Sequence, residues 1–169
     1  DILAVNIMMQ TDKEAAERLL KNVGNDVRRL SHELIPPRFD NASLSELVCT
    51  YCQSMSAENG TIVKPFVSRS FEKLNLPSRT ALEVYRIVQE SVSNAIKYGY
   101  SKMITVTLDA SNNQASLCIA NDISPEHPIT QGKMGIGKDT LKMRTEALKA
   151  VLTISEQDEE YKVEVRFPL

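Results

Sequence analysis

The chain has 169 residues, of which 42% are hydrophobic and 25% are charged, and its formal net charge at pH 7 is -2. This length is sufficient for one sizeable core and a helical extension, and the slightly acidic balance argues against a nucleic-acid partner. No apolar run reaches membrane-spanning length and no signal-peptide pattern is present, which predicts a cytoplasmic chain without direct membrane insertion.

Apolar residues recur at helical spacing over residues 12–34, which predicts an amphipathic helix that stops before Pro36-Pro37. This stripe has no strand partner in the neighbouring sequence and is typical of a bundle or dimer surface. A second helix is predicted over 43–58, and Asn59-Gly60 should form the turn before a strand at 61–68.

Cys49 and Cys52 form a C-x-x-C pattern in the second predicted helix. No second pair follows, and on a helix the two thiols share an apolar face with Leu44 and Val48. We therefore expect packing rather than a metal or redox role, and three cysteines in the whole chain fit a reducing compartment.

The stretch 79–99 predicts a helix with a polar face of unusual composition. At about 100° per residue, Arg86, Glu90, Asn94 and Lys97 occupy an arc of about 80°. The apolar residues on the far side are Leu82, Val84, Tyr85, Val88, Val92, Ala95 and Ile96. Asparagine is a mediocre helix former, so its mid-helix position favours a chemical role over a merely solvated face.

A carboxylate one turn before an amide oxygen suits a water held beside hydrated Mg²⁺. The string QESVSNAIKYG (89–99) resembles the N-box of sensor histidine kinases and their relatives in the GHKL ATPase superfamily. The resemblance implies ATP and Mg²⁺ as cofactors. It makes Asn94 the Mg²⁺ ligand, Glu90 the water-positioning residue or catalytic base, and Lys97 a cation on the phosphate side.

Two segments with period-2 apolar patterning follow, at 102–110 and 114–123, and predict adjacent strands. In the family that the chain resembles, the second strand ends in Asp-x-Gly, and the Asp carboxylate binds the adenine amino group. This chain has Asn121, Asp122 and Ile123 there. The resemblance implies that Asn121 or Asp122 binds adenine, and an Asn oxygen accepts the hydrogen bond without the strengthening charge.

Residues 132–148 predict a glycine-punctuated loop that leads into a helix. Gly135 and Gly137 lack side chains, so backbone N–H groups there can approach an anion. The segment is similar to the second glycine box of these kinases, with Arg144 in the place of their usual arginine. The region 122–135 is expected to act as a lid over the phosphates.

The run 151–169 predicts a closing hairpin, with Tyr161, Val163, Val165 and Phe167 on the buried side of its last strand. It resembles the end of the kinase domain, down to the terminal Phe-Pro-Leu. Glu160-Tyr161 replaces the Gly-Thr that the family often carries there.

The string RRLSHELIPP (28–37) resembles the end of the second dimerisation helix in histidine kinases that pair with LuxR/NarL-like response regulators. In that family the phosphoacceptor histidine lies in the first dimerisation helix, which implies an acceptor upstream of Asp1. His32 is then a structural or solvent-facing residue, and His127 is a lid residue.

These observations predict an α/β fold: a two-layer α/β sandwich of the Bergerat (GHKL) type, preceded by an α-helical dimerisation segment. The expected domains are 1–58, for dimerisation and phosphotransfer, and 59–169, for ATP binding. The implied function is that of a homodimeric sensor histidine kinase, the soluble part of a membrane-anchored sensor. It would autophosphorylate on the upstream histidine and pass the phosphoryl group to a response regulator aspartate.

Two alternatives remain open at this point. A degenerate, non-catalytic GHKL-fold scaffold is favoured by the missing glycines at Ile123 and Glu160. An anti-sigma-type serine kinase of the same superfamily is disfavoured by the long amphipathic helix at 12–34, because those kinases lack such an extension.

Overall fold

The computed structural model describes residues 13, 15–17, 19–20, 23–24, 39, 42–99, 101–123, 135–157 and 159–169. The chain divides into two units, Asp1–Pro37 and Arg38–Leu169. Every described residue of the first unit is helical, as the periodicity of 12–34 predicts. His32, His127 and most of the expected lid at 122–135 lie outside the described residues.

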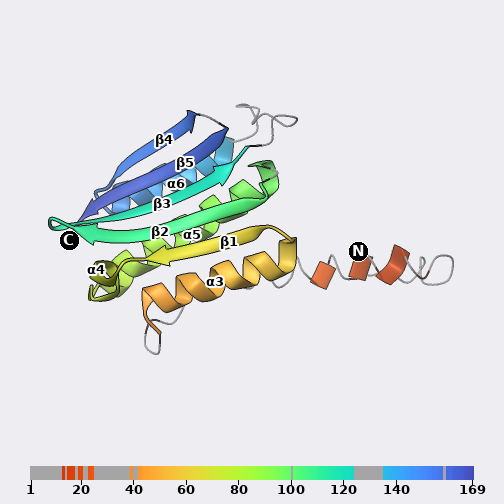
Figure 1. Cartoon of the computed structure of the whole chain (residues 1–169), viewed down its shortest axis with the longest axis horizontal. Coiled ribbons are helices and arrows are strands. Elements are labelled where there is room, and N and C mark those ends of the chain that lie inside the picture. The colour runs from red at the N-terminus through yellow and green to blue at the C-terminus, as the bar shows by residue number, and fades with distance from the viewer. Residues whose placement is uncertain are drawn as a thin grey trace. The chain divides into compact units, whose positions relative to one another are not determined.

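The second unit is a five-stranded sheet with helices packed against it (Figure 1). Its elements are α3 (Leu44–Asn59), β1 (Ile62–Val67), α4 (Arg69–Glu72), α5 (Ser78–Gly99), β2 (Met103–Ser111), β3 (Gln114–Asp122), α6 (Gly135–Ala147), β4 (Val151–Gln157) and β5 (Glu160–Pro168). The strand order is β1-β2-β3-β5-β4, with β1 parallel to β2 and the other neighbours antiparallel. The predicted α/β fold is confirmed.

The sheet buries one face, as the period-2 pattern of its strands requires. In Figure 1, α5 and α6 lie behind the strands and α3 runs alongside β1. The alternate residues of β2 and β3 that face this covered side are buried: Ile104, Val106, Leu108, Ala110, Ala115, Leu117, Ile119 and Asn121. β2 and β3 are adjacent, as predicted, and Asn112 and Asn113 form the turn between them with φ of 50° and 62°. Asn tolerates this left-handed region better than most residues.

Helix α5 lies at the centre of the packing. Val84, Val88 and Val92, which belong to its predicted apolar stripe, are fully buried. Ile87 is also fully buried although it lies outside that stripe, whereas Leu82 is only half-buried. The buried face is therefore wider than the sequence predicts, because α5 contacts the sheet and also α3 and α6.

Helix α3 begins at a capping box. The Ser43 side chain accepts from the Glu46 backbone N–H, and the Ser43 backbone N–H donates to the Glu46 carboxylate at 2.8 Å. Gly60 ends the helix with φ of 69°, which places the turn where Asn59-Gly60 predicts it. The contacts place the boundary between the units after Pro37, earlier than the predicted boundary at residue 58, because α3 packs in the core of the sheet.

Cys52 is fully buried in this core, and burial raises the pKa of its thiol to about 12. Cys49 and Cys118 are half-buried, and all three cysteines are free thiols. The short helix α4 was not expected from the sequence. Within the described ranges, none of the helices is both long and apolar enough to span a membrane.

Candidate functional site

Glu90 and Asn94 form a hydrogen-bonded pair on the half-buried side of α5. The Asn94 Nδ2 group donates to Glu90 Oε1 at 3.0 Å, as residues one turn apart on a helix can. This bond uses the donor end of the amide and leaves its oxygen, Oδ1, for another group. The pair therefore presents amide and carboxylate oxygens, which are the ligands that Mg²⁺ prefers.

The described residues contain no cluster of three or more His, Cys, Asp or Glu side chains that would bind a metal by itself. Mg²⁺ usually keeps several waters and binds one or two protein groups plus substrate phosphates. The Glu90–Asn94 pair fits that mode of binding and not an all-protein metal cage.

Lys97 is exposed in the last turn of α5, on the polar arc that also carries Glu90 and Asn94. A cation there is favoured by the negative end of the helix dipole. An exposed ammonium group on a flexible stem suits a ligand that carries several negative charges.

Asn121 lies near the end of β3 on the face that the helices cover, and it is only 3% exposed. Its Nδ2 group donates to the Ser101 hydroxyl at 2.9 Å and to the Asp122 backbone carbonyl at 3.0 Å. The Ser101 hydroxyl in turn donates to the same carbonyl at 2.8 Å. These bonds fix the amide with its nitrogen toward β2, so its oxygen is the atom offered to a ligand.

Asp122 occupies the next position but has a different role. Its carboxylate is exposed and accepts from the backbone N–H groups of Lys102, at 3.1 and 3.3 Å, and of Met103, at 3.1 Å. These bonds cap the start of β2. Because side chains alternate across a strand, Asp122 points away from the helix-covered face. Of the two candidates for binding adenine, only Asn121 lies on the face that the helices cover.

Gly135 and Gly137 lie within the first turn of α6, because the helix begins at Gly135. The sequence predicted both glycines in the loop before the helix, and that placement is wrong. The first N–H groups of a helix have no intrahelical partner, so the amides that the prediction placed in the loop belong to the helix start.

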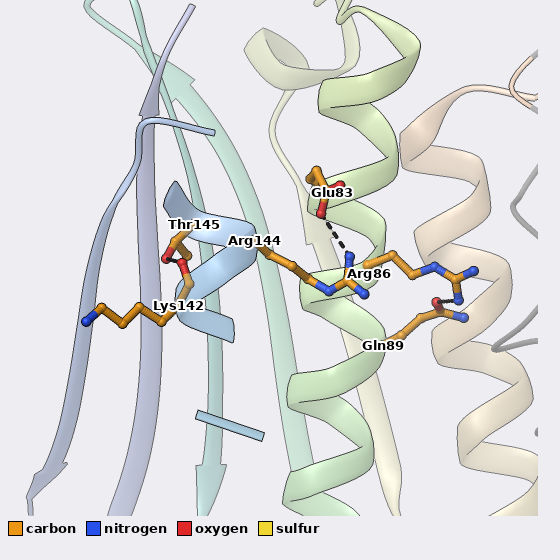
Figure 2. Close-up of polar contacts among 6 residues, drawn as sticks. All are labelled: Glu83, Arg86, Gln89, Lys142, Arg144 and Thr145. Atoms are coloured by element: carbon orange, nitrogen blue, oxygen red, sulfur yellow. Dashed lines mark hydrogen bonds and ion pairs between the residues drawn. The ribbon is translucent and has the colours of Figure 1, made fainter. Parts of the chain in front are cut away.

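An ion pair that the sequence did not predict joins α5 to α6 (Figure 2). Arg144 Nη1 lies 2.9 Å from Glu83 Oε2, and the two side chains are 30% and 21% exposed. Glu83 precedes Glu90 by seven residues, so it lies about 20° from it around the helix. The polar arc of α5 is therefore also where α6 docks. No local pattern indicates this pair, because its members are 61 residues apart.

A second polar contact lies on α5 beside this ion pair. Arg86 Nη1 donates to Gln89 Oε1 at 2.9 Å, and Gln89 is buried (Figure 2). The Gln89 backbone carbonyl accepts from the Tyr51 hydroxyl of α3 at 3.3 Å. The Tyr51 hydrogen bond ties α3 to the middle of α5, next to Glu90.

Comparison with known proteins supports a kinase relationship. No protein-family model matches the chain. It is 24% identical over 136 residues, 79% of its length, to the sensor histidine kinase MctS of Rhizobium johnstonii. It is 30% identical over 97 residues, 57% of its length, to the oxygen sensor histidine kinase NreB of Staphylococcus carnosus. The matches cover 29% and 27% of these proteins, so the chain spans less than a third of the length of the curated relatives it matches.

Solved structures show the same fold. The histidine kinase domain of the blue-light-activated kinase EL346 from Erythrobacter litoralis aligns with a TM-score of 0.62 at 16% identity, over 75% of this chain and 61% of that one. Full-length ShkA in complex with AMPPNP aligns with a TM-score of 0.55 at 16% identity, over 92% of this chain and 36% of that one. The chain is therefore similar in sequence to part of two sensor histidine kinases, and its sheet and helices have the fold of histidine kinase catalytic domains.

Proposed function

We propose that the unit of residues 38–169 binds Mg·ATP beside α5, the end of β3 and the start of α6, and that it serves a sensor histidine kinase. The observation that carries this proposal is the Glu90–Asn94 hydrogen bond, which orients an amide oxygen away from its own carboxylate partner. A helix residue held in this way is suited to bind a metal, whereas a solvated surface asparagine needs no such partner.

The side chains fit the two ends of a nucleotide. Asn94 would bind Mg²⁺ through Oδ1, and the metal would supply charge neutralisation at the phosphates. Lys97 would contact the phosphates, and the first amides of α6, at Gly135 and Gly137, would bind them from the other side. Asn121 would accept a hydrogen bond from the adenine amino group through Oδ1.

Catalysis of phosphoryl transfer is largely positioning and electrostatic stabilisation. These residues therefore need to position the nucleotide and its metal ion, and they need not form covalent bonds with the substrate. Glu90 is the candidate for the remaining chemical task, orienting water or accepting the proton of the attacking group. Its hydrogen bond with Asn94 couples that task to the metal ligand.

The rest of the proposed activity concerns the longer protein. The acceptor histidine would lie in a helix upstream of Asp1, residues of the helical unit 1–37 would pair in a homodimer, and the phosphoryl group would pass to an aspartate of a response regulator. The similarity to NreB and the string 28–37 support a LuxR/NarL-like regulator. In this proposal the longer protein is anchored in a membrane, and the part described here lies in the cytoplasm.

A non-catalytic scaffold is the alternative that one observation favours. The chain has Ile123 and Glu160-Tyr161 where the kinases that it resembles carry glycines, so its base-binding end departs from theirs. A scaffold would keep the fold but would no longer bind the nucleotide.

Isothermal titration calorimetry with ATP, with and without Mg²⁺, separates the two functions. The native chain is expected to bind ATP more tightly with Mg²⁺, and Asn94→Ala should abolish that difference while the protein still unfolds cooperatively. Gln114→Ala, an exposed change at the opposite end of β3, is the matched control and should behave as the native chain. No binding to the native chain at millimolar ATP would decide for the scaffold.

A further inference from the structure

The two edges of the sheet are protected to different degrees, and β1 is the protected one. The Val63 backbone N–H donates to the Ser56 hydroxyl of α3 at 2.8 Å, and this hydroxyl donates to the Val63 carbonyl at 3.3 Å. Pro65, two residues further along β1, has no N–H group. The outer side of β1 therefore offers few free backbone groups to a further strand.

Strand β4 forms the opposite edge of the sheet, away from α3 (Figure 1). It contains no Pro, Gly, Lys or Arg, the residues that commonly protect an edge strand. Among the described residues, the hydrogen bonds of its backbone are those of the pairing with β5. Every second residue of an edge strand directs its N–H and C=O groups away from the paired strand, so β4 can accept a further strand.

The apolar side chains of β4 are poorly covered. Val151 is 67% exposed and Ile154 is 37% exposed, and Leu152 is partly buried against the core. Val163, which pairs with Ile154 on β5, is buried. The helices therefore cover β4 less completely than β5, and a strand added beside β4 would bury apolar surface.

The sequence of β4 is complementary to itself in one antiparallel register. With Thr153 opposite the same residue of a second copy, Leu152 of each copy faces Ile154 of the other. Glu156 is the only charged residue of β4, and in this register it faces Ala150 of the other copy, so like charges do not meet. Apolar pairs and Thr–Thr pairs across neighbouring strands are stabilising.

Neighbouring registers fit less well. Residues on the same face must oppose one another in a continuous two-fold sheet, so the centre of the pair lies on a residue. A centre at Ile154 would set the Glu156 carboxylate opposite Leu152. A centre at Leu152 would leave Ile154 opposite the small side chain of Ala150.

We propose that a second copy of this chain adds antiparallel to β4, with Thr153 on the two-fold axis, and joins the two sheets into one. This contact goes beyond the proposed nucleotide binding, and it is separate from the proposed pairing of residues 1–37. One pair of short strands buries less surface than a permanent dimer needs, so the association is weak and reversible.

Cross-linking of the full chain tests the register. Opposed Cα atoms in an antiparallel pair are about 4.5–5.5 Å apart, within the range of about 4.4–6.8 Å that a disulfide spans. Thr153→Cys should therefore form a disulfide dimer when oxidised glutathione is added. The native chain, with its three free cysteines, sets the background.

Two further variants make the pattern specific. Val151→Cys or Ser155→Cys alone places each thiol about 14 Å from the same thiol of the second copy, because four residues of strand separate them. Neither variant alone should cross-link above background. Their mixture should form the mixed disulfide, because Val151 faces Ser155 of the second copy.

A matched pair of lysine substitutions in the Thr153→Cys chain tests the role of the edge. Ile154→Lys should slow cross-linking about fivefold or more, because it removes apolar pairs and puts a charge on the edge strand. Ile62→Lys changes a 53% exposed isoleucine on the opposite edge strand and should leave the rate unchanged. Both changes lie at exposed positions, and cooperative thermal unfolding should be retained in each variant.

The outcomes decide between possible occupants of the edge. Equal cross-linking of the three single cysteine variants would indicate random collision or a dimer formed elsewhere, and it overturns the inference. A Thr153→Cys chain that stays at background also overturns it and leaves the edge to a strand of another protein. So does an unchanged rate in Ile154→Lys. None of these results depends on ATP binding, which calorimetry tests separately.

Discussion

The Glu83–Arg144 ion pair is the only contact between charged side chains that the described part of the structure places between α5 and α6. We predict that Glu83→Ala lowers the free energy of unfolding and loosens the attachment of α6. The perturbed contact is one hydrogen bond of 2.9 Å between Arg144 Nη1 and Glu83 Oε2. Arg144 also buries an Nε group that has no partner among the described residues, so its stem is held against the protein.

The degree of burial of the ion pair determines how much free energy of unfolding is lost in Glu83→Ala. An exposed ion pair contributes about 0.2–1 kcal/mol, and removing one partner of a fully buried pair costs about 3–5 kcal/mol. Side chains that are 30% and 21% exposed lie between these limits. We expect a loss of about 1–2 kcal/mol for Glu83→Ala, which corresponds to a decrease in Tm of about 3–8 °C for a unit of this size.

A double-mutant cycle isolates the pairwise interaction. Urea unfolding of Glu83→Ala, Arg144→Met and the double variant should give a coupling free energy of about 1 kcal/mol. The pair between Arg166 and Glu164 on β5 is the control, because its arginine is 60% exposed although the separation is 2.7 Å. Its coupling should be no more than about 0.5 kcal/mol. A coupling at Glu83–Arg144 as small as that of the control would refute the reasoning from burial.

Other predictions concern the rest of the unit. Ser43→Ala removes the capping box of α3 and should cost about 1 kcal/mol in thermal unfolding; no change would mean that the cap is dispensable. The pKa of Cys52 is raised from 9.0 to about 12, so the unfolded thiol ionises first and the free energy of unfolding should fall as pH rises from 9.0 to about 12. Urea titrations across that range should show this fall, and Cys52→Ala should make it smaller without removing it, because the pKa values of Tyr161 and Cys118 are also raised. Leu117→Ala should cost about 2–5 kcal/mol because the side chain is fully buried, whereas Leu169→Ala, at a 43% exposed position, should change the urea midpoint little.

The sequence was sufficient for most of the local elements, but it missed the short helix α4 and placed the start of α6 too late. Periods of 2 and 3.6 in the apolar residues predict the strands and the long helix. The face of a strand or helix on which a side chain lies depends only on its spacing from residues a few places away in the chain. The turn at Gly60 and the polar arc of α5 are also local properties. Glu90 and Asn94 meet because residues four apart on a helix are neighbours, so their pairing follows from the spacing.

Contacts between distant segments were decided by tertiary structure. The sequence left both Asn121 and Asp122 as candidates for binding adenine. Only the pairing of β2 with β3 shows that Asp122 caps the start of β2 while Asn121 faces the helices. The ion pair between Glu83 and Arg144 and the pairing of Tyr161 with Asn121 across β5 and β3 have the same origin. Each depends on the register and packing of elements far apart in the chain, which no pattern within one element specifies.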